Sequence, residues 1–142
     1  MTPPTLFRTA VCGLLLAASV AAADDLEKLA GKWSVKKTDD RGESFTQTLE
    51  IKKDKLTFQI LRSDGTLRIF ATGDVKLEKL GPFNAIKIIN IKAGANESET
   101  SPVDDDRTLI YQLDENTWTL ASNFDKERNQ KPSVDVYRRA DK

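Results

Sequence analysis

Chemistry in this chain has to rely on carboxylates, lysines, tyrosines and arginines. The 142-residue sequence has no histidine and a single cysteine, Cys12, which lies inside an N-terminal apolar run. Without these residues the chain can build neither a Ser-His-Asp nor a Cys-His nucleophile, nor a His- or Cys-ligated metal or haem site. We therefore expect a protein that is not an enzyme and that carries no cofactor.

The densest group of reactive side chains is a set of five carboxylates in residues 93–107, which we expect to form one long loop. They come from Asn-Glu-Ser-Glu at 96–99 and from three aspartates at 104–106. Clustered carboxylates can hold Ca²⁺, but this spacing fits no EF-hand loop. A glycosidase-like pair would need a cleft that separates the two pKa values. The interpretation we favour is a solvated acidic loop without a metal.

The first 23 residues have the pattern of a secretory signal. Arg8 supplies a positive start, and the apolar run at 10–20 is shorter than the roughly 20 residues of a membrane span. The alanines at 21–23 are small enough for signal peptidase. We expect cleavage after Ala23 and a periplasmic or secreted domain over 24–142, with no remaining membrane span. An uncleaved anchor is the alternative.

The charge balance and the length of the chain limit the kinds of protein that it can be. Basic and acidic residues are equal in number, at 22 each. This balance argues against a nucleic-acid partner, which requires an excess of lysine and arginine. Residues 24–142 are enough for one domain and too few for two. Without cysteine in that stretch, packing rather than disulfides must hold it together.

Short alternating runs of apolar and polar residues, separated by turns, are the elements that must position any site. Asp64-Gly65 predicts a tight hairpin turn. The alternation changes phase at Ile88-Ile89, which predicts a β-bulge or a strand buried on both faces. A helical turn is expected at 24–30. The eight candidate strands predict an all-β, antiparallel, up-and-down barrel; they lie near 33–38, 45–51, 56–60, 67–77, 86–91, 109–113, 118–120 and 134–136.

An eight-stranded barrel is just wide enough to be filled by side chains or to hold one small ligand. A packed core and a pocket for a small hydrophobic ligand both remain open, with Gln47 or Tyr111 as the polar anchor of a pocket. The residues expected to line this interior are Phe45, Gln47, Leu49, Phe58, Ile60, Ile69, Ile88, Tyr111 and Leu120.

Gly31-Lys32-Trp33 resembles the Gly-x-Trp signature of the lipocalin and calycin barrels. In those barrels the tryptophan packs at the closed end beneath an arginine from just after the last strand. Arg138 and Arg139 stand in that place here, and the sequence leaves open which of them matches. The resemblance implies a structural clasp, because a cation over an aromatic ring contributes about 0.5–2 kcal/mol.

A closer resemblance covers nearly all of residues 24–142. Residues 25–33 (DLEKLAGKW) are similar to the opening of a family of small exported lipocalin-like bacterial domains, found mainly in planctomycetes, that has no established activity. The stretch 85–88 (AIKI) is similar to one of its strands, and 110–120 (IYQLDENTWTL) to its hairpin. Members commonly carry a cysteine where this chain has Ala121-Ser122, and a glycine where it has Ile110.

That resemblance implies a barrel and no particular ligand. By fold-level analogy with lipocalins, the hypothesis is an exported, non-catalytic binding module that takes a small hydrophobic molecule. The alternative is a ligand-free barrel that makes protein-protein contacts in the cell envelope through its loops, chiefly residues 93–107.

Overall fold

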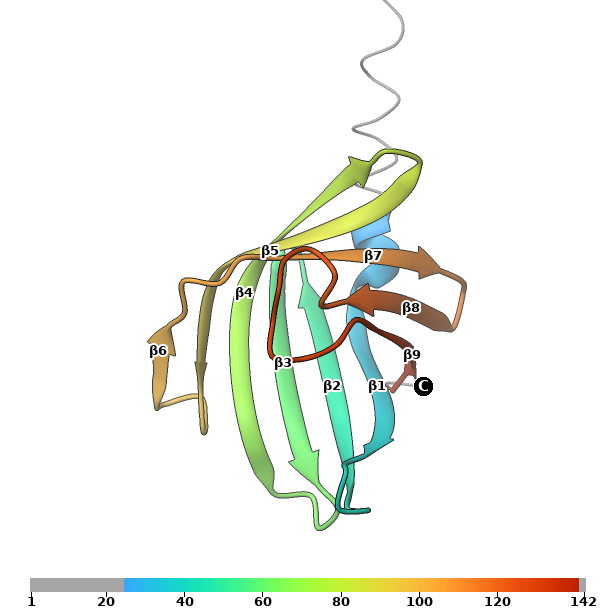
Figure 1. Cartoon of the computed structure of the whole chain (residues 1–142). Helices are drawn as coiled ribbons and strands as arrows, with labels where there is room; N and C mark the ends of the chain where they lie inside the picture. The colour runs from blue at the N-terminus through green and yellow to red at the C-terminus, as the bar shows by residue number, and fades with distance from the viewer. Residues whose placement is uncertain (1–24, 141–142) are drawn as a thin grey trace, which may run out of the picture.

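Eight antiparallel strands pair in a closed ring, and a ninth short strand is added at its side (Figure 1). The structure, a computed structural model, describes residues 25–140. The strands follow chain order around the ring, and β9 returns to pair with β1, which confirms the predicted barrel. The ring consists of β1 (Gly31–Thr38), β2 (Ser44–Lys52), β3 (Lys55–Arg62), β4 (Leu67–Leu80), β5 (Phe83–Gly94), β7 (Arg107–Leu113), β8 (Thr117–Ser122) and β9 (Ser133–Arg139).

The β3–β4 turn shows how local chemistry fixes the strand order. Gly65 adopts a φ of 85°, which favours glycine. The Asp64 carboxylate accepts hydrogen bonds from the backbone N–H of Thr66 at 2.9 Å and from its hydroxyl at 2.7 Å. The turn expected at Asp64-Gly65 is therefore present, and it directs β4 back along β3.

The phase change in the alternation of β5 is a β-bulge. Thr72 pairs with Lys92 and Asp74 with Ile89, so two residues of β5 lie opposite Gly73 alone. One of the two, Asn90, has a φ of 52°. The bulge thus falls directly after the Ile88-Ile89 step at which it was predicted, and it keeps apolar residues on the inner face on both sides.

The expected long loop at 93–107 is partly wrong. β5 continues to Gly94, and β6 (Thr100–Pro102) pairs back against it. A Cβ on Gly94 would lie 1.7 Å from the backbone oxygen of Glu99, so this close hairpin requires glycine. The sequence hides the strand because its residues are polar and it contains a proline.

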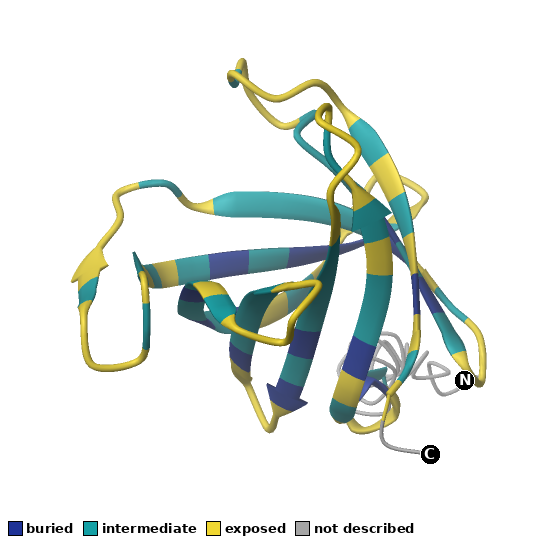
Figure 2. Cartoon of the chain, turned by 90° about the horizontal axis from the view of Figure 1, so that it is seen from below, coloured by how far each residue is buried: buried dark blue, intermediate teal, exposed yellow. Residues whose placement is uncertain are grey.

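The buried core fills one end of the barrel. On β2, Leu49 and Ile51 are buried whereas Phe45 is half-buried; on β3, Leu56 is buried and Ile60 half-buried. Figure 2 shows buried residues within the strands and mostly exposed connections. The packed cluster consists of Leu29, Trp33, Leu49, Ile51, Leu56, Val75, Ile86, Ile88, Tyr111, Trp118, Leu120 and Tyr137.

A helical turn at 25–29 covers this packed end, with Leu29 fully buried beneath it (Figure 1). The predicted signal segment, residues 1–23, lies outside the described residues. Within 25–140, no helix has the length and apolar character needed to cross a membrane.

Gly73→Ala is expected to lower the free energy of unfolding by about 1–3 kcal/mol. A Cβ there would lie 2.7 Å from Cγ2 of Ile88 and 3.2 Å from the backbone oxygen of Ile89. Without such a collision, the change would stabilise by about 0.4–1 kcal/mol. Urea unfolding followed by tryptophan fluorescence measures the difference. Thr72→Ala, one residue earlier, is the control, and an unchanged or raised stability for Gly73→Ala would contradict the packing at the bulge.

Candidate functional site

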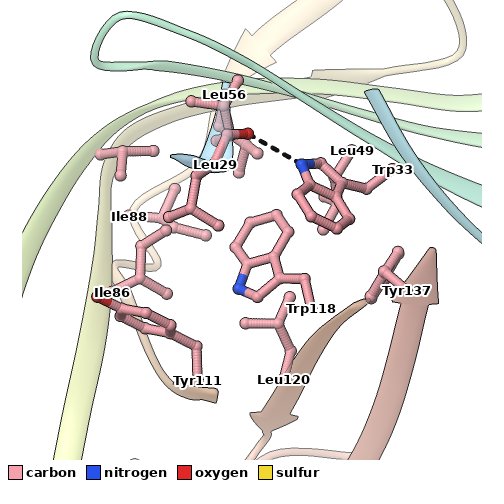
Figure 3. Close-up of a cluster of buried hydrophobic side chains, with 12 residues drawn as sticks. Leu29, Trp33, Leu49, Leu56, Ile86, Ile88, Tyr111, Trp118, Leu120 and Tyr137 are labelled. Carbon is pink, nitrogen blue, oxygen red and sulfur yellow. Dashed lines mark hydrogen bonds between the residues drawn. The ribbon is translucent and has the colours of Figure 1, made fainter. Parts of the chain in front are cut away.

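Trp33 is the centre of the packed end. Its side chain is fully buried, and its indole N–H donates to the carbonyl of Leu29 at 2.9 Å (Figure 3). Trp118 meets it edge to face, with ring centroids 5.7 Å apart. The guanidinium carbon of Arg139 lies 4.3 Å from the centroid of the Trp33 ring. The indole is therefore held between a second aromatic ring and a cation.

Arg139 also ties the helical turn to the barrel. Its guanidinium donates to the carbonyl of Ala30 at 2.9 Å, to that of Lys28, and to that of Glu115 at 3.3 Å. Gly31, with a φ of 112°, makes the bend between the turn and β1. The structure thus brings Gly31, Trp33 and Arg139 together, whereas Arg138 is exposed and points elsewhere. This arrangement is a structural clasp.

The nine interior residues singled out from the sequence divide into two groups. Register places all of them on the inner face, because they pair with one another or alternate with buried residues. Leu49, Ile88, Tyr111 and Leu120 belong to the packed cluster. The other five are half-buried. Phe58 packs against that cluster, and the remaining four lie toward the open end of the barrel, opposite the helical turn: Phe45, Gln47, Ile60 and Ile69.

The two expected polar anchors already have partners. The Tyr111 hydroxyl donates to the Asp25 carboxylate at 2.7 Å, next to the helical turn, and burial together with this bond raises the pKa of Tyr111. The side-chain carbonyl of Gln47 accepts from the hydroxyl of Tyr137 at 3.0 Å. Burial, followed by the charge of Asp135, raises the pKa of Tyr137. Tyr137 therefore stays a neutral donor over the physiological range.

A charged pair that the sequence did not reveal lies on the same inner face. The Lys37 ammonium is 3.1 Å from the Asp135 carboxylate, and the two side chains are 31% and 17% exposed. Lys37 comes from β1 and Asp135 from β9, 98 residues apart in the chain. The β1 and β9 side of the open end is therefore polar, whereas the β2, β3 and β4 side is mainly apolar.

Trp118 contributes one further polar group to the interior. Its Nε1–H is fully buried and has no acceptor among the described residues. Figure 3 shows this nitrogen on the side of the indole that faces Tyr111 and Ile86. A buried donor without an acceptor costs about 1–3 kcal/mol. The packed end thus offers a hydrogen bond to a small polar acceptor such as a water.

A concavity of about 790 Å³ lies on the rim of the open end, between the β1–β2 and β3–β4 turns. It adjoins the inward-facing Phe45 and is otherwise mostly charged or polar. Its lining residues are Asp39, Asp40, Arg41, Gly42, Glu43, Ser44, Phe45, Arg62, Ser63, Asp64 and Arg68.

The interpretation of a solvated acidic loop is wrong at Asp105. The Nη1 group of Arg128 donates to both carboxylate oxygens of Asp105, at 2.7 and 2.6 Å. The ammonium of Lys126 is 2.6 Å away and the guanidinium of Arg107 3.1 Å. Arg128 also pairs with Asp125 at 3.2 Å. This ion cluster joins the β6–β7 connection to the β8–β9 connection.

Arg139→Ala is expected to lower the free energy of unfolding by about 1–3 kcal/mol, because it removes the cation over Trp33 and three hydrogen bonds to carbonyls. Arg138→Ala, a neighbouring exposed arginine, should change it by less than about 0.5 kcal/mol. Urea unfolding of both variants provides the comparison. Equal effects of the two substitutions would contradict the assignment of Arg139 to the clasp.

Asp105→Asn is expected to lower the urea midpoint at pH 7, and to lower it by a smaller amount at pH 3. Hydrogen bonds from Arg128 and Lys126 hold the pKa of Asp105 well below its ordinary value of 3.8. A pKa that is lowered on folding gives stability above about pH 4, which is lost as the pH falls through the folded-state value. The exposed Asp104→Asn is the control. A difference that persists undiminished at pH 3 would contradict the electrostatic origin.

No protein-family model, curated protein or solved structure matches this chain. Within residues 25–140, no group of three or more acidic side chains is placed to hold a metal ion. The function of the protein is therefore indicated by the geometry of the barrel, and in particular by the contrast between its two ends.

Proposed function

We propose that this protein is a non-catalytic binding module that takes a small, largely apolar molecule in the open end of its barrel. The observation that carries the proposal is the contrast along the barrel axis. Trp33, Ile51 and Ile86 are fully buried at one end, whereas the inward-facing Phe45 and Ile60 toward the other end are only half-buried. Apolar side chains that face inward without being buried are typical of a ligand site.

Burial supplies the driving force for this binding. Each Å² of apolar surface removed from water contributes about 25 cal/mol, and part of that offsets the cost of immobilising the ligand. Since the core already fills the closed end, the ligand has to be small enough for the open end alone.

The polar groups of the open end favour a ligand with at least one polar atom. Gln47 and Tyr137 form one hydrogen-bonded pair there, and Lys37 and Asp135 form the charged pair. Lys37, Tyr137 and Asp135 lie on β1 and β9, and Gln47 on the neighbouring β2 adjoins the apolar Ile60 of β3, so the polar wall borders the apolar one. A molecule with an apolar body and one polar end matches both walls.

The proposed setting is outside the cytoplasm, on the basis of the signal pattern in residues 1–23. The proposal of a non-catalytic role is supported by the lack of histidine and cysteine in residues 24–142. On the inner face toward the open end, Lys37 and Asp135 are paired with each other.

A second candidate function, protein-protein contact, is favoured by one surface feature. The β4–β5 hairpin projects beyond the packed end of the barrel (Figure 1). At its tip Leu80 is 45% exposed and Phe83 53% exposed. Exposed apolar side chains at a projecting tip are suited to contact with another macromolecule.

The neutral fluorescent probe N-phenyl-1-naphthylamine tests the ligand site. Titration into the wild type is expected to give saturable, blue-shifted emission. Ile60→Glu places a charge on the inner face of the open end and should weaken binding at least about tenfold.

Val134→Glu is the matched control, because Val134 lies on the outer face of β9 and is 64% exposed. It should bind the probe as the wild type does, and far-UV circular dichroism checks that both variants fold. Equal binding by the wild type and Ile60→Glu would contradict a site in the open end. Absence of any probe binding would move the preference to the second candidate.

A further inference from the structure

The barrel ring has one weak link, where β1 meets β9. Only Trp33 with Arg139 and Ser34 with Arg138 are paired there. Every other neighbouring pair of strands in the described ring shares four or more residue pairs. The strand ladder stops after Ser34 although β1 continues to Thr38.

Side chains take over where the ladder stops. Continuing the register of β1 and β9 would place Lys37 opposite Asp135, and these two residues form the ion pair at 3.1 Å. Two residues nearer the paired end of β9, the Tyr137 hydroxyl reaches past β1. It donates a hydrogen bond to the side-chain carbonyl of Gln47 on β2, at 3.0 Å. The strands are therefore linked toward the open end by an ion pair and a hydrogen bond between side chains. We call this stretch, residues 35–37 and 135–137, the seam.

The seam differs from its surroundings in how easily it can separate. Opening a strand ladder breaks several backbone hydrogen bonds together, whereas opening the seam breaks one partly exposed ion pair and one side-chain hydrogen bond. Partly exposed ion pairs contribute little, and an opened Lys37 and Asp135 would both regain water. Lys37 and Asp135 also lie on the inner face, so their separation opens the wall of the proposed ligand site.

We infer that β1 and β9 part along the seam to admit the ligand, and that the Lys37–Asp135 pair is the latch that sets the rate of entry and release. This inference rests on the proposed function, because it concerns access to the same open end. It predicts that weakening the latch speeds both binding and release of a ligand, while the apolar residues that hold the ligand are untouched.

Stopped-flow release of N-phenyl-1-naphthylamine from the full protein tests the latch. Asp135→Asn removes the ion pair and is expected to speed release about three- to fivefold. The exchanged pair, Lys37→Asp with Asp135→Lys, should return the rate toward that of the wild type. Glu50→Gln is the matched control: it removes a cross-strand ion pair with Lys32 where β1 and β2 are fully paired, and it should leave release unchanged.

Hydrogen exchange of the same variants, without probe, gives an independent measure. Asp135→Asn is expected to speed amide exchange at Ser34 and Arg138, the last paired residues beside the seam, but not in the β2–β3 hairpin. If Asp135→Asn and the wild type both bind the probe but show equal release rates and equal amide exchange beside the seam, the latch is overturned. A protein that binds no probe would instead contradict the proposed function, and the entry route would fall with it.

Discussion

The barrel closes where Trp33 and Arg139 meet, and the rest of the structure depends on that contact. The two residues are one of only two cross-strand pairs between β1 and β9, and they are also the ring and cation of the clasp. The same guanidinium fixes the helical turn over the packed end. Closure of the ring and capping of the core are therefore a single interaction. Because it joins the first strand to the last, this contact is also one of the most non-local in the fold.

Because β1 and β9 pair only near Trp33, the opposite end of the barrel is less constrained. Around Trp33 the interior is filled by two indole rings, two tyrosines and aliphatic side chains, and it needs no guest. Farther along the barrel axis the same strands continue, but β7, β8 and β9 are shorter than β4 and β5, so their side of the wall ends sooner. The inward-facing side chains of Phe45, Ile60 and Ile69 are therefore only half-buried. The shape that stabilises the domain and the shape suited to a ligand thus arise from one unequal set of strand lengths.

Local patterns in the sequence were sufficient for the eight strands of the ring, the Asp64-Gly65 turn and the bulge after Ile89, because each depends on neighbouring residues alone. The interior face was also predictable, since alternation fixes which side chains point inward. The partners of the charged residues could not be predicted in this way. Asp105 looked solvated because Arg128 lies 23 residues away, and the pairing of Lys37 with Asp135 requires the register of the closing strands. The choice between Arg138 and Arg139 likewise depends on which of two adjacent side chains points toward Trp33.

Native mass spectrometry of the protein, purified gently from a host that exports it, tests the central claim most directly. The claim is that the open end of the barrel holds a small, largely apolar molecule. The account predicts additional mass on the folded protein that disappears on denaturation, or that appears after exposure to a mixed lipid extract. A protein that carries no additional mass, and still carries none after that exposure, would contradict it.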